Sequence, residues 1–203
     1  MTLAGRLLPG AAAALVALPM LAVLAAVLHG AAGADPELWA HLREFVLPGV
    51  TRSTILLVAG VVALSLVLGT SLGWLTAACE FPGRGFFAWA LLLPLAMPAY
   101  VLAFVAVATL DFAGPVPTQL RAWFGAGFTV PPIRSTGGVI AVLSLAFYPY
   151  VYLLARGAFL THGTRALEAG QSLGLGPWAG FFRVALPLAR PWIAAGAALV
   201  AME

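Results

Sequence analysis

One polar segment of the chain carries residues at a regular spacing, and it lies between two strongly apolar stretches. A group of one acidic and two small residues is followed, after three residues, by a glycine. Nine residues further on comes an apolar group that ends in proline. In order, the residues are Glu168, Ala169, Gly170, Gly174, Val184, Leu186 and Pro187. A single carboxylate among small residues provides no acid–base pair. The spacing of these residues is the most informative feature of the chain.

Residues for other kinds of chemistry are missing or scattered. All ten basic residues are arginine, so a phosphate-binding G-x-x-x-x-G-K-[ST] loop is impossible. His29, His41 and His162 are far apart, Cys79 is the one cysteine, and no group has metal-ligand spacing. Ser/His/Asp and paired-carboxylate constellations are missing too, and no basic run suits nucleic acid. We expect no enzyme activity, no cofactor and no metal, with any ATP hydrolysed by a separate subunit.

The segment itself should form two short helices. Thr164 can cap a helix that runs to Leu173, and Gly174 suits the left-handed position just past its end. Gly176-Pro177 can start a second helix, which should stop near Pro187 because proline disfavours helical geometry in the preceding residue. Together they predict a stiff knob at the membrane surface. The alternative is an amphipathic loop that rests on the bilayer through Trp178, Phe181 and Phe182.

The elements around this loop should be membrane helices, since 63% of residues are hydrophobic and 8% charged, against about 25% charged in soluble domains. Four uncharged segments approach the roughly 20 residues that a span needs. A fifth apolar run, Pro191–Glu203, would reach only roughly 20 Å of a core about 30 Å thick. We therefore expect a fragment that ends inside its fifth span. The four predicted spans are Leu7–Leu28, Thr54–Ala78, Phe86–Leu110 and Gly138–Ala155.

The arginines predict the orientation of these spans. With a cytoplasmic N-terminus, six arginines lie inside and four outside, which also puts the loop 161–190 in the cytoplasm. The first span has an apolar core of about 22 residues, longer than the 7–15 of a signal peptide, so we expect it to be retained. The inner arginines are Arg6, Arg84, Arg156, Arg165, Arg183 and Arg190, and the outer ones are Arg43, Arg52, Arg121 and Arg134.

Several features on the outer side and within the spans have two readings. Asp35-Pro36 should cap a surface helix, and the loop 111–137 is either an interfacial anchor or a docking surface. Gly69 and Gly73 should allow close helix packing. Prolines in the spans, with nearby tyrosines, either line a translocation path or only improve packing. These residues are Pro94, Pro98, Pro149, Tyr100, Tyr148, Tyr150 and Tyr152.

The four complete spans contain no charged side chain. Carriers coupled to protons or ions usually need such groups within the membrane. Energy for transport must then come from elsewhere, or the protein is passive. A projecting loop that docks on a separate ATPase would supply that energy.

The loop resembles the EAA loop of ABC importer permeases, whose pattern is E-A-A, three residues, G, nine residues, I-x-L-P. The chain departs from it at Gly170 and Val184. Other stretches resemble the ferric-iron subfamily, and the likeness covers most of residues 51–203. They are Phe81–Arg84, Leu93–Val101, Gly114-Pro115, Leu120-Arg121 and Ala201–Glu203.

The resemblance implies an all-α polytopic bundle of the type I ABC importer permease kind, with residues 1–203 as its N-terminal part. It implies a bacterial inner-membrane protein with a cytoplasmic ATPase dimer, a periplasmic binding protein and lipid as partners. Glu168 and Ala169 would lie on the coupling helix, Gly174 at its elbow and Leu186-Pro187 at the return to the membrane. Ferric iron is the favoured substrate. Thiamine, polyamine and sulfate remain alternative substrates. A multi-span membrane protein with no transport role remains an alternative function.

Overall fold

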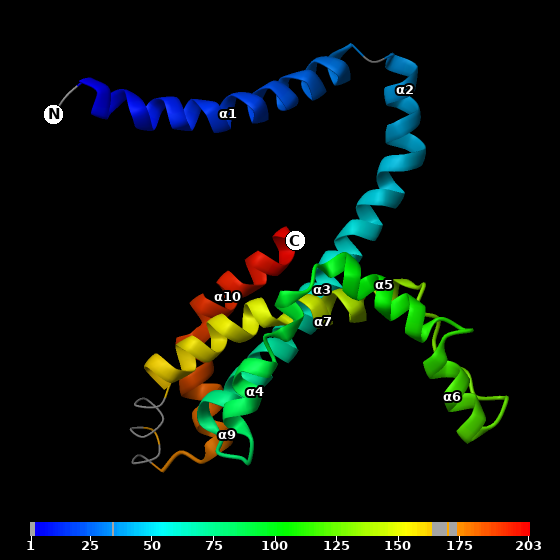
Figure 1. The fold of residues 1–203 in the computed structure, drawn as a ribbon, viewed down its shortest axis with the longest axis vertical. Helices are drawn as coiled ribbons and strands as arrows, with labels where there is room; N and C mark the ends of the chain where they lie inside the picture. The colour runs from blue at the N-terminus through cyan, green and yellow to red at the C-terminus, as the bar shows by residue number, and fades with distance from the viewer. Residues whose placement is uncertain (1–2, 34, 164–169, 171–173) are drawn as a thin grey trace. The chain divides into compact units, whose positions relative to one another are not determined.

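The regular elements of the chain are helices throughout the part that the computed structural model describes, which is residues 3–33, 35–163, 170 and 174–203. The chain divides into two compact units, Met1–Ser53 and Thr54–Glu203 (Figure 1). Within the described residues, four helices are long and apolar enough to cross a membrane: Pro36–Ala78, Ala99–Phe124, Thr136–Thr161 and Trp178–Met202. The expectation of an all-α membrane protein with several spans is confirmed.

The first unit contains α1 (Leu3–Ala32), α2 (Pro36–His41) and the π turn η1 (Leu42–Val46). The predicted cap of α2 is present, because the Asp35 carboxylate accepts a hydrogen bond from the Glu37 N–H at 3.1 Å. A separate surface helix is not present, since α2 and η1 continue directly into α3 (Leu47–Ala78). The π turn makes this possible, because the Leu47 N–H bonds to the carbonyl of Leu42, five residues back, just before a proline.

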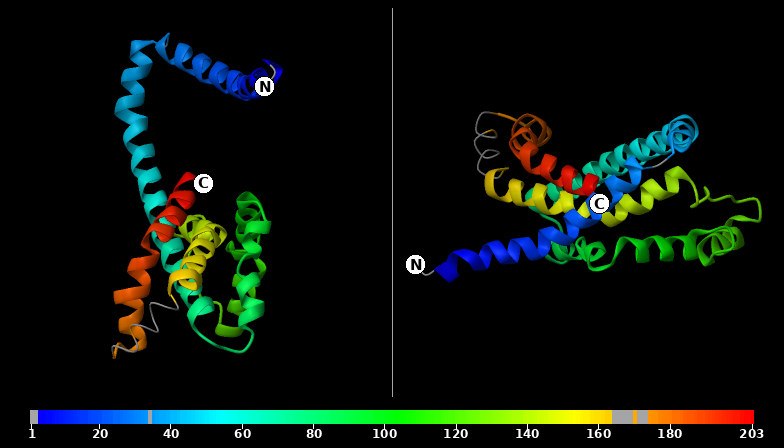
Figure 2. Two further views of the ribbon diagram at one scale, coloured as in Figure 1. Left: turned by 90° about the vertical axis from the view of Figure 1, so that its left-hand side faces the viewer. Right: turned by 90° about the horizontal axis from the view of Figure 1, so that it is seen from above.

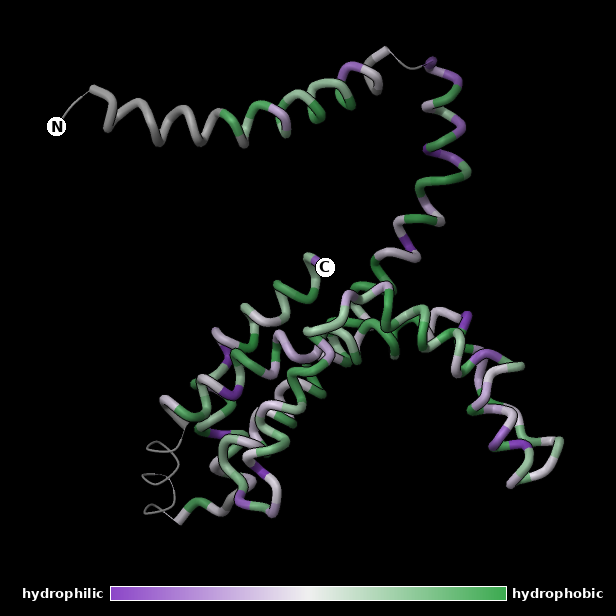
Figure 3. The backbone as a smooth tube through the Cα atoms, in the orientation of Figure 1, coloured by the Kyte–Doolittle hydropathy of each residue, from purple (hydrophilic) through white to green (hydrophobic). Residues whose placement is uncertain are grey.

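In the second unit, α3 is followed by a series of helices of very different lengths. Hydrophobic residues run along α5, and hydrophilic ones gather around α6 (Figure 3). The elements are α4 (Arg84–Ala90), the 3-10 turn η2 (Leu93–Ala96), α5 (Ala99–Leu110), α6 (Pro115–Phe124), α7 (Thr136–Ala158), the π turn η3 (Phe159–Gly163), α9 (Pro177–Gly180), the π turn η4 (Phe181–Ala185) and α10 (Leu186–Met202).

The predicted third span, Phe86–Leu110, is not one helix. It is broken between Ala90 and Ala99, where Pro94 and Pro98 cannot donate backbone hydrogen bonds. Met97 is extended, with φ −111° and ψ 133°, so the chain changes direction before α5 begins. The prediction of a continuous helix was wrong here because two prolines four residues apart remove donors from successive turns.

The prediction for the fifth apolar run, Pro191–Glu203, was wrong in the opposite direction, because the helix is longer than expected. Helix α9 begins at Pro177 as expected, but η4 and α10 continue it through Pro187 and Pro191 to Met202. The helix does not stop near Pro187, because the Leu186 N–H bonds to the Phe181 carbonyl, five residues back. That wide turn accommodates a residue without an N–H. The apolar helix Trp178–Met202 therefore has 25 residues, and part of it lies in the segment that we expected to be a loop.

Helix α7 lies between α10 on one side and the α4–α5 segment on the other (Figure 2). Glycines allow the close approach. A Cβ atom built on Gly69 of α3 would lie 2.6 Å from Val151 Cβ, and one on Gly196 of α10 would lie 2.8 Å from Val151 Cα. The packing role predicted for Gly69 and Gly73 is confirmed, since a Cβ on Gly73 would lie 3.1 Å from the Arg156 backbone nitrogen.

The loop between α5 and α7 contains α6 and is held by exposed polar contacts. Arg134 forms an ion pair with Asp111 at 2.8 Å. Arg121 donates a hydrogen bond to the Phe112 carbonyl at 2.6 Å, and its guanidinium lies 4.5 Å from the Phe112 ring centre. The aromatic side chains of Trp123 and Phe124 are largely exposed. These contacts fit both an interfacial anchor and a docking surface.

Candidate functional site

Gly174 has the left-handed backbone conformation that its position predicts, with φ +83°. The Leu175 N–H donates a hydrogen bond to the Gly170 carbonyl at 3.0 Å, which is the six-to-one bond of a Schellman motif. Gly170 is helical, as its place before such a motif requires. Glu168 and Ala169, together with the predicted cap Thr164, lie outside the described residues.

Two positions of the spaced pattern meet in space. A Cβ atom built on Gly170 would lie 3.2 Å from Leu175 Cδ1 and 3.8 Å from Val184 Cγ2. Gly170 is buried, and this residue packs on Leu175 and Val184 in the second half of the loop. The two departures from the family pattern, Gly170 and Val184, are thus neighbours. A small residue at 170 leaves room for a β-branched residue at 184.

Beneath this contact lies a cluster of three aromatic rings. Trp74 of α3 is 4.7 Å from Phe181 and 5.3 Å from Phe159, measured between ring centroids. Phe159 and Phe181 are buried, at 1% and 9% exposure, beside Ala185 and Ala189. The cluster joins α3 to both chain segments that flank the loop. The base of the loop, at Phe159 and Phe181, is therefore buried against α3.

The alternative prediction for this segment was an amphipathic loop that rests on the bilayer through three aromatic side chains. Phe181 does not fit this alternative. Phe181 points into the aromatic cluster, whereas Trp178 and Phe182 are 74% and 58% exposed and stack 6.4 Å apart. The sequence alone could not separate these three aromatic residues. Their different environments follow from the π turn η4, which sets which face of the helix each side chain occupies.

Arg84 has a role that the sequence did not indicate. Its Nε and Nη2 atoms donate hydrogen bonds to the carbonyls of Thr76 and Ala77, both at 2.8 Å. These carbonyls end α3 and lack helical partners, so the guanidinium caps them. Gly83, with φ +84°, makes the turn that brings Arg84 back to α3. The Phe-Pro-Gly-Arg stretch is therefore a helix-capping turn at the same end of the bundle as the loop.

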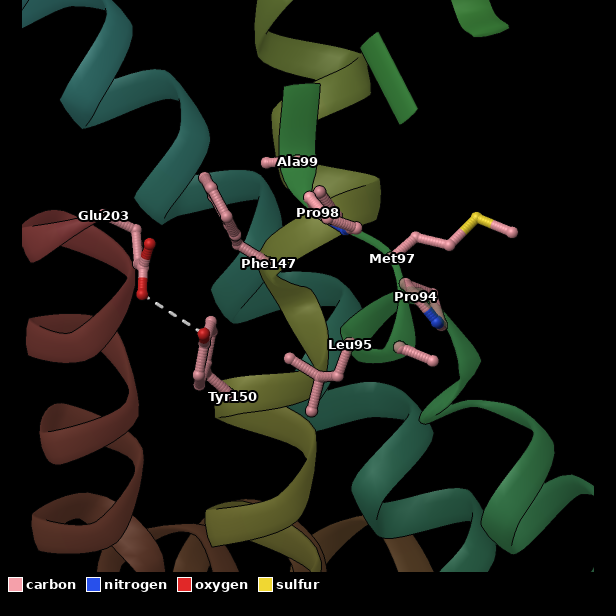
Figure 4. Close-up of a pocket in the computed structure, with 10 residues that line it drawn as sticks. Pro94, Leu95, Met97, Pro98, Ala99, Phe147, Tyr150 and Glu203 are labelled. Atoms are coloured by element: carbon pink, nitrogen blue, oxygen red, sulfur yellow. Dashed lines mark hydrogen bonds between the residues drawn. The ribbon is translucent and has the colours of Figure 1, made fainter. Parts of the chain in front are cut away.

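A second candidate site lies at the helix break. A pocket of about 300 Å³ is bounded by the chain from Pro94 to Ala99 and by Phe147 and Tyr150 of α7 (Figure 4). The Tyr150 hydroxyl donates a hydrogen bond to the Glu203 carboxylate at 3.2 Å. In Figure 4 the Met97 side chain extends away from Tyr150. Backbone freed by the break and one hydroxyl–carboxylate pair therefore supply the polar groups of the pocket.

The prolines and tyrosines predicted to line a path or improve packing have different surroundings, and the path reading stays a prediction. Pro94, Pro98 and Tyr150 line the pocket. Tyr148 and Tyr152 instead donate hydrogen bonds to main-chain carbonyls of the α4 end, and Pro149 is buried within α7. Tyr100 is 75% exposed on α5. Among the described residues, no three His, Cys, Asp or Glu side chains come together as metal ligands.

Comparison with known proteins gives a family match that begins within α3. Residues 69–203 match the family described as "Binding-protein-dependent transport system inner membrane component". The match includes the capping turn, the helix break, α7, the loop and α10, which are the elements of both candidate sites.

The chain is similar to several curated proteins that are named as transport system permeases. The chain is 35% identical over 140 residues to the molybdenum transport system permease protein ModB of Azotobacter vinelandii, covering 69% of this chain and 60% of that protein. It is 30% identical over 138 residues to ModB of Escherichia coli K12, covering 68% and 58%. It is 24% identical over 146 residues to the molybdate/tungstate permease protein WtpB of Thermococcus kodakarensis, covering 72% and 52%.

The chain thus spans between about half and three fifths of the length of these relatives. The expectation of a permease is supported at the level of the family. The expectation of ferric iron is not supported, because these relatives are named for molybdenum, molybdate or tungstate. The Leu-Pro-Leu-Ala-Met-Pro-Ala-Tyr stretch that favoured iron forms the helix break between α4 and α5.

Proposed function

Because the chain belongs to the family of binding-protein-dependent transport system inner membrane components, we propose that it forms part of the permease of an ATP-driven molybdate importer. The observation that carries this proposal is the left-handed Gly174, bonded through Leu175 to Gly170 above the buried aromatic base. This is the build expected of a surface that receives force from another protein. An ordinary connecting loop does not need such a base.

The partners of this permease are a cytoplasmic ATPase dimer and a periplasmic binding protein. Glu168, Ala169, Gly170 and Gly174 form the ATPase-facing part of the loop, with Val184, Leu186 and Pro187 at its return to the membrane. The N-terminus then lies in the cytoplasm, as the distribution of arginines favours. Closure of the ATPases on ATP moves the loop, and the bundle turns its cavity outward to receive substrate.

The names of the relatives support molybdate or tungstate as substrate. The pocket does not distinguish between ions, because its lining offers one carboxylate, Glu203, which is bonded to Tyr150. A weak set of groups suits a solute that passes through the membrane after release from a binding protein. Selection would then lie in the binding protein.

Uptake of radiolabelled molybdate by the full-length gene product tests the substrate. The protein is reconstituted in liposomes with the ATPase and the binding protein encoded with it. We expect ATP-dependent uptake that unlabelled tungstate suppresses and ferric citrate, thiamine or spermidine leaves unchanged. Suppression by ferric citrate alone would restore the iron assignment. No uptake of any of these solutes would contradict the importer proposal.

Purification of the full-length protein in mild detergent tests the coupling surface. We expect the ATPase to be recovered with it and to be lost from the Glu168→Ala variant. Glu80→Ala is the matched control, because Glu80 is an exposed carboxylate just past the C-terminal end of α3. Equal recovery of the ATPase with both variants would remove Glu168 from the contact.

Gly174→Val separates shape from charge at the same surface. A β-branched side chain opposes a φ of +83°, so the turn distorts while Glu168 remains. We expect the ATPase activity stimulated by the loaded binding protein to fall at least tenfold. Normal stimulation would show that the glycine elbow is not needed.

A further inference from the structure

The backbone carbonyls at the end of α4 lose their regular partners at the helix break. The Leu92 N–H bonds to the Trp89 carbonyl at 2.9 Å, and the Leu95 N–H bonds to the Leu92 carbonyl at 3.0 Å. Both donors have moved to a nearer carbonyl than a regular α-helix would use. The carbonyls of Ala88 and Leu91, which an unbroken helix would pair with these two donors, are therefore left without them.

Two tyrosines of α7 replace the missing donors. The Tyr152 hydroxyl donates to the Ala88 carbonyl at 2.9 Å, and the Tyr148 hydroxyl donates to the Leu91 carbonyl at 2.8 Å. They are four residues apart and thus on one face of α7. Both side chains are buried, at 0% and 6% exposure. The break is consequently held to α7 at two points, one helical turn apart.

Tyr152 is also fixed from the side of α3. Its hydroxyl lies 3.1 Å from Thr76 Oγ1, and Thr76 is fully buried. The adjacent carbonyls of Thr76 and Ala77 receive the guanidinium of Arg84, which begins α4. Three elements, α3, α4 and α7, are therefore linked by neighbouring polar contacts.

Helix α7 reaches the base of the loop only one turn beyond Tyr152. Ala155, Ala158 and the following Phe159 are buried against Phe181 and Ala185. On the other side, the residues before and between the tyrosines, Ala146, Phe147 and Tyr150, line the pocket. A single helix thus contacts the loop base, the broken helix and the pocket.

We propose that Tyr148 and Tyr152 are positioning residues that transmit movement of the coupling loop to the helix break. When the loop base moves α7, the two hydrogen bonds make the α4 end and the chain from Pro94 to Ala99 move with it, which changes the pocket. The inference rests on the proposed function and adds to it the element that links the two candidate sites. The spaced loop pattern does not include either tyrosine.

Conservative removal of the hydroxyls tests this link. Tyr148→Phe, Tyr152→Phe and the double variant keep the rings and their packing, and Tyr100→Phe removes an exposed hydroxyl as the matched control. Each full-length protein is reconstituted with its ATPase and binding protein, and molybdate uptake and ATP hydrolysis are measured separately. We expect uptake per ATP to fall about fivefold in each single variant, the size of effect that loss of one buried hydrogen bond has on an equilibrium, and further in the double variant. Basal ATP hydrolysis and the Tyr100→Phe control should stay at the wild-type level.

A distance measurement follows the link itself and needs no transport. Spin labels at Phe86 of α4 and Leu153 of α7, both exposed, report how tightly the two helices are held. The distance distribution should broaden in the double variant and stay narrow with Tyr100→Phe.

Unchanged uptake per ATP, an unchanged distance distribution, or a parallel loss of uptake, hydrolysis and thermal stability would overturn the link. The last result would show that the tyrosines only support folding. If the wild-type protein took up no solute, the proposed function would fall, and the inference with it.

Discussion

The sequence Leu-Pro-Leu-Ala-x-Pro occurs twice in the chain, and the two copies fold differently. Residues 93–98 form a 3-10 turn and then an extended segment, and they separate α4 from α5. Residues 186–191 are helical throughout and lie at the start of α10. The same prolines in the same register therefore break one helix and are tolerated in another. Local propensity does not explain the difference, since five of the six residues are the same.

The surroundings of the two copies explain it. The second copy follows a π turn, in which the Leu186 N–H bonds five residues back, and its Ala189 is buried at the base of the loop. The first copy follows α4, and the carbonyls freed there are bonded by tyrosines of α7. Both arrangements are stable because their backbone groups have partners. Tyrosines of α7 bond the carbonyls freed at the first copy, and a wider turn accommodates the second copy.

Replacing the prolines of the first copy should have the largest effect. Pro94→Ala with Pro98→Ala restores two N–H groups, and each replacement favours a continuous helix by about 3 kcal/mol. We expect α4 and α5 to straighten toward one helix, the pocket to close and transport to be lost. Spin labels at Phe86 and Phe104, exposed on the two helices, would report the change in distance. An unchanged distance would show that the tyrosine contacts alone impose the break.

Gly196→Leu addresses the packing that supports the second copy. The new Cβ would lie 2.8 Å from Val151 Cα, a backbone atom that cannot move aside, so α10 must separate from α7. We expect a loss of about 3 kcal/mol or more, at the upper end of overpacking, measured as thermal unfolding in detergent. Gly157→Ala is the control, because no heavy atom lies within 4 Å of its added Cβ. Equal stability of both variants would contradict the close α7–α10 contact.

Arg84→Ala tests the start of α4, the helix that precedes the first copy. The variant loses two hydrogen bonds from a charged group to the α3 carbonyls. We expect a destabilisation of about 1.5–3 kcal/mol. Arg84→Lys should recover only part of it, since an ammonium group cannot reproduce the two-point contact. Thermal unfolding of the three proteins checks the order, and full recovery with lysine would reduce the role of Arg84 to its charge.

Pro187→Ala should have the smallest effect. The helix already passes this residue, so alanine adds one N–H to a turn that has adapted to its absence. We expect thermal stability to change by less than about 1 kcal/mol, well below the cost of a proline in an unadapted helix. Helix content from circular dichroism should be unchanged. A large gain in stability would mean that the π turn stores strain.

The sequence predicted those features that depend on short spacing. The Asp35 cap, the left-handed Gly174, the helix start at Pro177 and the close packing at Gly69 and Gly73 all follow from a few neighbouring residues, and all are present. The coupling role of the loop stays a prediction, as does the part played by Glu168 and Ala169, which lie outside the described residues.

Features that depend on distant partners were missed. The cap from Arg84 to α3 needs a turn that brings it back eight residues, and the aromatic base joins residues as far apart as Trp74 and Phe181. The tyrosines were recognised as hydroxyls near bends, but their partners lie 57 and 64 residues away. Periodicity within a span contains no signal for such pairs.

The sequence alone determined that this is a helical membrane protein with a spaced loop pattern, because hydropathy and short-range turn chemistry act within a few residues of the chain. Tertiary structure decided which of two matching proline segments breaks a helix and which tyrosines line a pocket. In an apolar bundle every freed backbone group must find a partner, and that partner comes from whichever helix packs alongside.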